Sequence, residues 1–375
     1  MLPGTADDAS SRRGAVVSED GAVKPPDTLD DIDLPWLRDA MGCSDELIAF
    51  DVQSLSDGVG FLGLTGRVRL HYAGSPTGPE SVVVKLRRRA DDTELMSQYW
   101  DAWAREAVFY DELAGDVVVR VPSAHHVTNR PGEFALILED GAPAVSGDQV
   151  AGPAPGQAEV AIDAIASMHA AWWDSPRLAE PAIHRVSTTA RIVGDRFEEA
   201  FPTLRHRFGG RVTEKAFEDI EWFAGEIARW RDTVDFGPPT LIHTDFRLDN
   251  LLFHPDGGVI FVDWQLFGPG RGPRDIANFI CTNLDPPERR ARERGLLTGW
   301  NDAFERSGGQ RLDDRLLWEE YVAWVLVSTL TYAATVTALD DTNERGRALF
   351  DAMLTRALTA TDDLDAASVV ARQLG

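Results

Sequence analysis

The sequence predicts a bilobal α+β fold, with a small β-sheet lobe that carries one important helix, followed by a large, mostly helical lobe. Three observations predict it. Short runs with strand-like composition or alternation fall between residues 49 and 138, and from residue 142 onward apolar residues recur mainly at helical spacing. One group of short strands, at 240–265, interrupts the helical part. The chain therefore changes character once, near residue 142.

Composition excludes several classes of protein. The 375 residues are 43% hydrophobic and 26% charged, as in a globular protein with room for two lobes. The net charge of −24 argues against nucleic-acid binding, which requires Lys and Arg to neutralise phosphates. Cys43 and Cys281 lie far apart and suggest neither a disulfide framework nor a zinc site, so we expect a cytoplasmic protein. The N-terminus lacks the apolar core of a signal peptide.

The chain divides into three predicted regions. Residues 1–28 are rich in Gly, Ala, Asp, Ser and Pro without periodicity, and we expect a disordered tail. Residues 29–141 form the predicted N-lobe and residues 142–375 the predicted C-lobe. Thr28 is expected to cap a short helix that runs through Asp39.

A glycine-rich turn lies between two predicted strands at 49–55 and 67–72. It contains Gly58, Gly60 and Gly63. Such a turn can cover phosphates, because backbone N–H groups point at the anion and glycine lets the backbone approach closely. The alternative is an ordinary hairpin turn.

A lysine and a glutamate follow on the next two elements. Lys85 is the one interior lysine of a predicted strand at 81–86. A helical pattern over 92–114 places Glu106 among aromatic residues on its buried face, where a carboxylate requires a cationic partner. We expect Lys85 to be that partner; the alternative is a surface lysine at a strand end.

Two further strands are predicted in the N-lobe, at 117–122 and 134–138. The second meets the acidic, glycine-containing turn Glu139-Asp140-Gly141. In the C-lobe, helices are predicted at 157–173, 191–208, 213–234 and over 288–374. His169 is expected to be a satisfied core histidine. The aromatic residues of 191–234 are expected to line the core or a cleft.

One uncharged run, 321–339, approaches bilayer-spanning length. Its Ser and Thr residues and acidic flanks favour a buried helix instead, so we expect no membrane association.

The most informative stretch is Thr240–Gln265, which reads as strand, loop, strand, turn, strand. Asp245, Asn250 and Asp263 stand at the ends of paired short strands and can converge on one point. Such oxygen ligands suit Mg²⁺, which takes one or two protein carboxylates together with substrate phosphates.

The spacing of these residues is specific. His243-x-Asp245 followed by four residues and Asn250 matches the H-x-D-x-x-x-x-N catalytic loop of kinases, and Asp263 follows thirteen residues later. With HTDFRLDNLLF, VDWQ and GPRDIANF, the chain resembles the aminoglycoside phosphotransferase and choline kinase-like family, which has a protein-kinase-like fold. It is also similar to the ecdysteroid kinase-like and hydroxyacyl kinase-like members of that family.

The resemblance implies a role for each motif residue. Asp245 would be the catalytic base, and Asn250 and Asp263 would hold Mg²⁺. Lys85, fixed by Glu106, would position the phosphates of ATP or GTP. The backbone at Glu139 and Gly141 would contact the base.

Three more residues near this loop have expected roles. Arg247 is expected to touch the transferring phosphoryl group, the alternative being a solvent-facing salt bridge to Asp249. Asp275 is expected to brace the catalytic loop, and a helix N-cap is a compatible alternative. His243 is expected to hydrogen-bond the backbone near Asp263.

The acceptor is expected to be a small alcohol. Asp275 follows Asp263 by only twelve positions, which leaves no room for the long segment with which protein kinases seat a peptide. Aminoglycosides, amino alcohols, sterol-like alcohols and hydroxyacyl compounds stay open. An acidic cleft with Asp285 and Glu288 would favour a cationic acceptor; the many aromatic residues favour an apolar one. The competing hypothesis is a nucleotide-binding pseudokinase or regulatory module.

Overall fold

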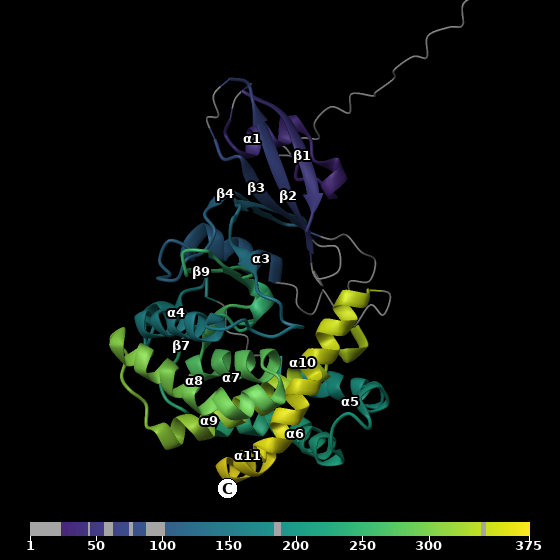
Figure 1. Cartoon of the computed structure of the whole chain (residues 1–375), viewed down its shortest axis with the longest axis vertical. Helices are drawn as coiled ribbons and strands as arrows, with labels where there is room; N and C mark the ends of the chain where they lie inside the picture. Colours follow the sequence, from purple (N-terminus) through teal and green to yellow (C-terminus); the bar gives the residue numbers. More distant parts are fainter. Residues whose placement is uncertain are drawn as a thin grey trace, which may run out of the picture.

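The computed structural model describes residues 24–43, 46–55, 63–74, 78–87, 102–183, 189–338 and 343–375. Figure 1 shows an antiparallel sheet at one end of the molecule and a helical assembly at the other, with the C-terminus at the far end of the helices. The predicted α+β, kinase-like architecture is confirmed. Residues 1–23 lie outside the described chain, and the lobe boundary at residue 142 stays a prediction.

The N-terminal sheet has five strands in the order β1-β2-β3-β5-β4, all antiparallel to their neighbours. Its strands are β1 (Leu47–Ser54), β2 (Gly63–Tyr72), β3 (Ser81–Arg87), β4 (Ala124–Arg130) and β5 (Glu133–Glu139). One face packs on α1 (Leu34–Ala40), and β4 and β5 also contact α3 (Ala102–Val108). Because side chains alternate across a strand, Val82, Val84 and Leu86 share the α1 core, and Lys85 faces the opposite side.

Two N-lobe predictions differ from the structure, and a third falls partly outside the described residues. The helix expected from Thr28 is instead a 3₁₀ turn (Leu29–Asp31) followed by α1. Asp33 caps α1 by accepting a 2.8 Å hydrogen bond from the Trp36 N–H. The N-cap is therefore Asp33, and not Thr28 as predicted. The helix expected over 92–114 is described from Ala102 as α3, which changes into a π-helix at Phe109–Leu113.

The strand predicted at 117–122 is absent. Within the described chain, this segment contributes only an isolated bridge between Arg120 and Ile260. The strand forms at 124–130 instead, where a tight turn at Gly132, with φ of 78°, pairs it with β5. The turn determines which residues pair, and so it overrides the apolar run just before it.

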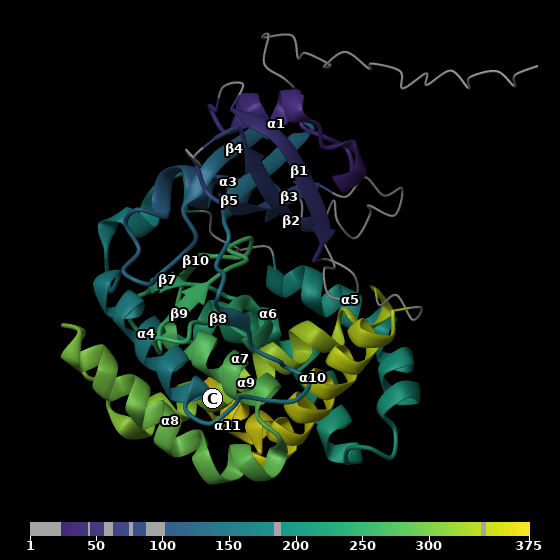
Figure 2. The ribbon, with the colours of Figure 1, turned by 45° about the horizontal axis from the view of Figure 1, so that its top comes forward.

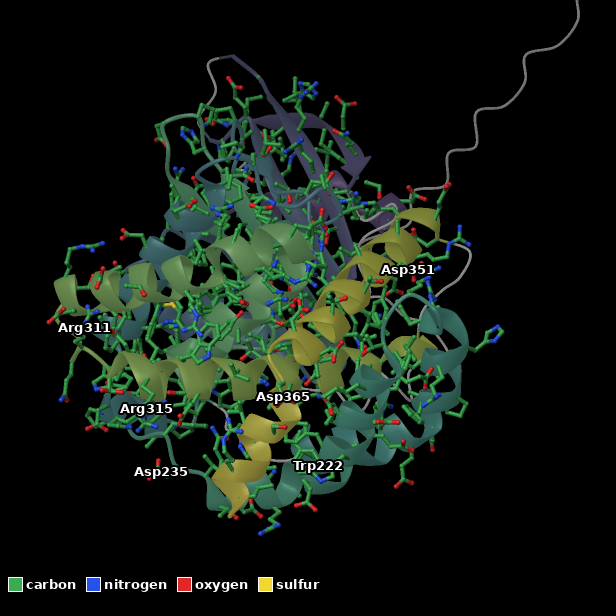
Figure 3. All side chains as sticks on the ribbon, turned by 60° about the horizontal axis from the view of Figure 1, so that its bottom comes forward. Trp222, Asp235, Arg311, Arg315, Asp351 and Asp365 are labelled. Carbon is green, nitrogen blue, oxygen red and sulfur yellow. The ribbon has the colours of Figure 1, made fainter. Side chains whose placement is uncertain are left out.

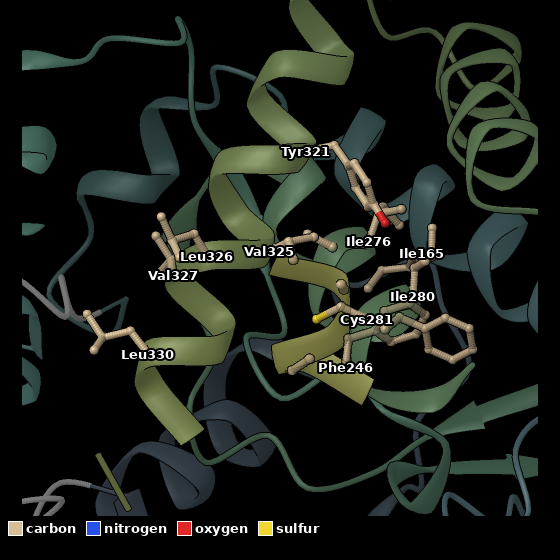
Figure 4. Packing of buried hydrophobic residues seen from close by; sticks show 14 of the residues in the cluster. Ile165, Phe246, Ile276, Ile280, Cys281, Tyr321, Val325, Leu326, Val327 and Leu330 are labelled. Carbon is tan, nitrogen blue, oxygen red and sulfur yellow. The ribbon is translucent and has the colours of Figure 1, made fainter. Parts of the chain in front are cut away.

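The helical part surrounds a continuous apolar core. Its helices are α4 (Gln157–Ala171), α5 (Thr189–Phe208), α6 (Glu214–Thr233), α7 (Gly272–Asn283), α8 (Pro286–Arg306), α9 (Asp314–Ala333), α10 (Glu344–Asp363) and α11 (Ala366–Leu374). Short 3₁₀ turns lie at Pro176–Ala179 and Val336–Ala338. Figure 4 shows Ile276 and Ile280 of α7 in the same cluster as Tyr321 and Val325 of α9. The first three predicted C-lobe helices are confirmed, and each observed end lies within two residues of the predicted one.

The uncharged run at 321–339 lies mostly in α9, which contacts α7, α10 and α11. Twelve residues of α9 are buried, including Val325, Leu326 and Leu330. The expected buried helix is therefore confirmed, and among the described helices none is long and apolar enough to span a bilayer.

Short strands lie between the sheet and the helices (Figure 2). They are β6 (Val145–Ser146), β7 (Thr240–Ile242), β8 (Leu251–Phe253), β9 (Val259–Phe261) and β10 (Gly268–Gly270). The strand–loop–strand–turn–strand prediction is confirmed, but one pairing differs. β8 pairs with β9 and β6, whereas β7 pairs with β10 in a separate two-stranded sheet.

Candidate active site

Asp245 and Asn250 meet inside the loop that joins β7 to β8. The Nδ2 of Asn250 donates to the Oδ2 of Asp245 at 2.8 Å and to the Asp245 carbonyl oxygen at 2.9 Å. A 3₁₀ turn (Leu248–Asn250) curls the loop back and makes this contact possible. Since the amide nitrogen faces Asp245, the amide oxygen of Asn250 points away from it and is available to another partner.

The hairpin β8–β9 brings Asp263 beside this pair. Leu251 pairs with Phe261, and the Val262 N–H donates to the Asn250 carbonyl at 3.0 Å, so Asp263 follows directly after a residue bonded to Asn250. Asp263 has a φ of 66°, a conformation that is rare for residues with a side chain and typical of functional turns.

Lys85 reaches the hairpin from the N-terminal sheet. Its Nζ donates to the Oε1 of Glu106 at 2.6 Å and lies 3.3 Å from the Oδ1 of Asp263. The predicted pairing with Glu106 is therefore present. Burial would lower the pKa of Lys85, but the carboxylates of Asp263 and Glu106 raise it above its ordinary value. Burial raises the pKa of Glu106, and the adjacent ammonium group opposes that rise.

The helix that carries Glu106 also contacts the hairpin through aromatic rings. Phe109 stacks on Trp264 with ring centroids 4.1 Å apart and planes inclined by 5°. Trp264 follows Asp263 directly, so the stack is a second contact, besides Lys85, between the segments that carry Glu106 and Asp263. Burial raises the pKa of the nearby Tyr110, as do Glu106 and Asp263.

Arg247 is paired inside the loop. Its Nε lies 3.0 and 3.1 Å from the two oxygens of Asp245, and its Nη1 lies 3.5 Å from Asp249. Only 11% of the Arg247 side chain is exposed, so the solvent-facing alternative is wrong, although the Asp249 contact exists. Burial would raise the pKa of Asp245, but the charge of Arg247, together with His243 and hydrogen bonds, lowers it below its usual value. Asp245 is therefore ionised at neutral pH.

Asp275 braces the loop from α7. Its two oxygens accept from the backbone N–H groups of His243 and Thr244, each at 2.8 Å. The N-cap alternative is wrong, because α7 begins at Gly272 and Asp275 lies inside its first turn. Thr244 has a φ of 73°, and these hydrogen bonds hold that strained backbone in place.

The two histidines near Asp275 have the contacts expected of them. His243 Nε2 lies 3.1 Å from the Val262 carbonyl, just before Asp263. His169 lies fully buried between Asp275, at 3.3 Å, and the indole N–H of Trp300, at 3.0 Å. It is the satisfied core histidine that the sequence indicated.

Two asparagines of α7 also hold the loop, and they were not among the sequence candidates. Asn278 donates to the Phe246 carbonyl at 3.3 Å, and Asn283 accepts from the Leu248 N–H at 3.0 Å. Both are buried. Their signal in the sequence is polar residues in an otherwise apolar helix, three and eight positions after Asp275.

Tyr332 is a third residue near the catalytic loop that was not among the sequence candidates. Its hydroxyl lies 3.5 Å from the Oδ1 of Asp245, at the C-terminal end of α9. Burial raises the pKa of Tyr332, and the charge of Asp245 adds to the rise, so the hydroxyl stays protonated. Nothing local in the uncharged run 321–339 distinguishes it from the other core residues.

The remaining sequence candidates are the glycines of the predicted phosphate-binding turn and the residues of the turn after β5. Gly58 and Gly60 lie outside the described residues. At Gly63 a Cβ would come 2.7 Å from the Trp103 ring, so close helix packing accounts for this glycine. The Glu139 side chain accepts from the Ser123 N–H at 3.1 Å. At Gly141 a Cβ would come 2.8 Å from Leu252, which places this turn against the β8–β9 hairpin.

The side-chain oxygen atoms of Asn250 and Asp263 suit Mg²⁺. The described residues contain no cluster of three His, Cys, Asp or Glu side chains able to hold a metal ion. A site made from the Asn250 amide oxygen and the partly exposed Asp263 carboxylate supplies only two protein ligands. That number fits Mg²⁺, which keeps several waters and binds substrate phosphates, rather than a closed zinc site.

Comparisons with known proteins bear on the family and the fold. Residues 71–307 match the model of the phosphotransferase enzyme family. A sequence search of curated proteins finds none that matches.

Solved structures share the fold. A choline kinase from Cryptosporidium parvum Iowa II aligns with a TM-score of 0.56 at 11% identity, over 85% of this chain and 91% of that one. A Plasmodium vivax ethanolamine kinase aligns with a TM-score of 0.53 at 12% identity, over 84% and 83%. A spectinomycin phosphotransferase in complex with ADP and spectinomycin aligns with 0.52 at 12%, over 84% and 93%. The protein-kinase-like fold predicted from the sequence is thus confirmed.

Proposed function

Because the chain belongs to the phosphotransferase enzyme family, we propose that it transfers the γ-phosphoryl group of ATP or GTP to a hydroxyl group of a small molecule. The observation that carries this proposal is the pairing of an ionised, partly buried Asp245 with Asn250, beside Asp263 and Lys85. Such transfer depends mostly on positioning and charge neutralisation, and these four side chains provide both.

In the proposed reaction, Asp245 accepts a hydrogen bond from the acceptor hydroxyl and orients its oxygen toward the γ-phosphorus. A new P–O bond forms, and the bond from the γ-phosphorus to the β,γ-bridging oxygen breaks. The hydroxyl proton passes to Asp245, and the nucleoside diphosphate leaves with the bridging oxygen. Because Arg247 lowers the pKa of Asp245, this carboxylate acts chiefly by orienting the hydroxyl, and it receives the proton late.

The nucleotide would bind between the sheet and the hairpin. Lys85, held by Glu106, would contact the α- and β-phosphates, and the glycines Gly58, Gly60 and Gly63 would lie over them. The backbone of Glu139 and Gly141 would contact the base. Asn250 and Asp263 would hold Mg²⁺, which when bound neutralises charge on the phosphates. In this proposal residues 29–141 bind nucleotide and residues 142–375 supply the catalytic loop and the acceptor site.

Arg247 would keep its place beside Asp245 and come near the transferring phosphoryl group. We also propose a cytoplasmic location, which the two free cysteines, Cys43 and Cys281, support.

The test is nucleoside diphosphate release from Mg·ATP or Mg·GTP with a panel of alcohols, checked by detecting the phosphate monoester. Asp263→Asn is expected to raise the Mg²⁺ concentration needed for half-maximal rate. The matched control is Asp256→Asn, which changes an exposed carboxylate in the β8–β9 turn.

The competing hypothesis of a pseudokinase predicts a different outcome. Mg·ATP would then raise the melting temperature while no alcohol is phosphorylated. That result, obtained with a panel that includes amino alcohols, aminoglycosides, sterol-like alcohols and hydroxy acids, would reject the proposed transferase activity.

A further inference from the structure

We propose that the acceptor alcohol carries a negatively charged oxyanion group, a carboxylate or a phosphate, and that Arg274 binds this group. The proposal rests on the proposed function, since it assigns the substrate class of the same site. It concerns a residue at the start of α7, the helix that braces the catalytic loop.

Arg274 differs from the arginines around it. Arg271, one turn earlier, has Nε and Nη2 at 2.8 and 2.9 Å from the two oxygens of Glu320. Arg356 lies 2.8 Å from Asp285. Exposed arginines such as Arg315 also find carboxylates, here Glu319 at 2.9 Å (Figure 3).

Arg274 itself is half-buried and forms no ion pair or side-chain hydrogen bond with the described chain. Its guanidinium carbon lies 5.5 Å from the ring centroid of Trp324, within the range of a cation–π contact. In a chain with a net charge of −24, a partly buried cation without a carboxylate partner stands out.

Its position costs the ligand-free protein free energy. Burial lowers the pKa of Arg274, because the charged form loses solvent, and the charge of the adjacent Asp275 offsets this only in part. It is also the third residue of α7, where the helix dipole disfavours a cation. Such uncompensated charge is expected where a ligand supplies the counter-charge.

Arg274 lies one helical turn before Asn278, on the same side of α7. Asn278 donates a 3.3 Å hydrogen bond to the carbonyl oxygen of Phe246, the residue after Asp245, so this side of α7 leads toward the catalytic carboxylate. The Tyr332 hydroxyl in turn lies 3.5 Å from Asp245. On α9, Trp324 and Tyr332 are eight residues apart, which is ~12 Å along a helix axis. An acceptor whose hydroxyl binds at Asp245 can thus extend toward the guanidinium group.

The structure removes support from the other acceptor classes. Asp285 and Glu288, which would have favoured a cationic acceptor, are paired with Arg356 and Arg292. The aromatic residues that favoured an apolar acceptor are mostly core residues. Phe197, Phe217, Phe223 and Trp230 are buried, and the ring of Phe201 packs against Phe197 at a tilt, whereas Trp222 is exposed (Figure 3). Among the described residues, the guanidinium of Arg274 is a recognition feature that neither an ion pair nor core packing accounts for.

The experiment compares matched acceptors of two to eight carbons at fixed Mg·ATP. The series are ω-hydroxy acids, their primary amides, amino alcohols of equal length, and phosphate monoesters of diols. Each is tested with the wild type, Arg274→Gln and Arg274→Lys. The control is Arg294→Gln: Arg294 also stacks on a tryptophan of α9, Trp318 at 3.7 Å, but that ring is fourteen residues from Tyr332, or ~21 Å along the helix.

We expect hydroxy acids or phosphate monoesters to be the better acceptors, and the comparison between them distinguishes a carboxylate from a phosphate. Arg274→Gln is expected to raise KM for the anionic acceptor about 10- to 100-fold, with little change in kcat or in KM for ATP. Amides should be unaffected. Arg274→Lys should recover part of the loss, and Arg294→Gln should behave as the wild type.

Binding without turnover is measured by the shift in melting temperature that each probe causes. Equal shifts in the wild type and in Arg274→Gln for every anionic probe, or a preference for amino alcohols, would overturn the proposal while leaving phosphoryl transfer intact. A melting temperature of ligand-free Arg274→Gln well below that of the wild type would also contradict it, because it would indicate a structural role. Failure of Mg·ATP to bind would count against the proposed function instead.

Discussion

The Nζ of Lys85 lies 3.3 Å from the Oδ1 of Asp263, a residue 178 positions later in the chain. The same ammonium group lies 2.6 Å from Glu106. One cation therefore connects strand β3, helix α3 and the hairpin β8–β9, and it is shared by a fully buried carboxylate and a partly exposed one. The arrangement orients the lysine before any nucleotide binds.

Replacing this lysine is expected to destabilise the protein. Lys85→Met leaves Glu106 fully buried without a cation, and we expect the free energy of unfolding to fall by about 3 kcal/mol. Glu106→Gln should cost less, because Lys85 keeps Asp263. Urea unfolding of both single variants and of the double variant gives the coupling energy. Additive effects in that cycle would contradict the shared-cation arrangement.

Asp245→Asn is expected to lower kcat about 10²- to 10⁴-fold, because an amide orients the acceptor hydroxyl poorly and cannot take its proton. The KM for ATP should change little, since the nucleotide contacts assigned to Lys85 are elsewhere. Initial rates with Mg·ATP measure both. Asp249→Asn, which removes the other carboxylate near Arg247, is the control and should lose less activity. Near-normal turnover in Asp245→Asn would rule out the assigned role.

The pH dependence of the reaction should reveal Arg247. In the wild type the pKa of Asp245 lies below 3.8, the ordinary value for aspartate. The carboxylate is therefore ionised at pH 5 and higher, and kcat shows no acid limb there. Arg247→Gln removes the largest factor opposing burial. The pKa of Asp245 then rises, the ionised fraction falls as pH decreases, and kcat should acquire an acid limb.

The measurement is log kcat against pH from 5 to 9 for both proteins. Arg345→Gln is the matched control, because Arg345 lies 3.9 Å from Asp249 and forms no ion pair with Asp245. Parallel profiles for the wild type and Arg247→Gln would show that Arg247 does not control the charge of Asp245.

Asp275→Asn is expected to loosen the catalytic loop. An amide has one acceptor oxygen, whereas Asp275 accepts from two backbone N–H groups through separate oxygens. We expect a loss of about 2 kcal/mol in the free energy of unfolding and a fall of about tenfold or more in kcat. Urea unfolding and initial rates measure the two effects.

The control for that variant is Asp235→Asn. Asp235 accepts a 2.8 Å hydrogen bond from the Gly237 N–H in the exposed loop before β7 (Figure 3). A loss of activity as large as that of Asp275→Asn would show that the effect is not specific to the brace.

Thr244→Gly should preserve activity. Thr244 adopts a φ of 73°, which costs a β-branched residue about 1–2 kcal/mol and costs glycine very little. The greater flexibility of glycine in the unfolded chain offsets part of the gain. We therefore expect stability equal to or up to about 1 kcal/mol above the wild type, and kcat within about threefold. Marked destabilisation would indicate a role for the threonine side chain.

Periodicity and turn chemistry were sufficient for most elements. The run at 81–86 predicted a strand with Lys85 as its one interior lysine, and the helical pattern over 92–114, which buries Glu106 among aromatic residues, predicted that the two would pair. Local reasoning failed where a competing interaction decided the outcome. The Gly132 turn moved β4 past the apolar run at 117–122, and Asp33 displaced Thr28 as a helix cap.

By itself, the sequence determined the fold class, the family and the spacing of Asp245, Asn250 and Asp263, because motif spacing and strand and helix periods are local properties. Only the tertiary structure decided the partners of these residues. That Arg247 pairs with Asp245, that Tyr332 approaches it, and that Arg274 forms no ion pair within the described part of the chain all depend on how α7 and α9 pack beside the loop. Charge and hydrogen-bond energies depend on distance and burial, which a one-dimensional pattern does not contain.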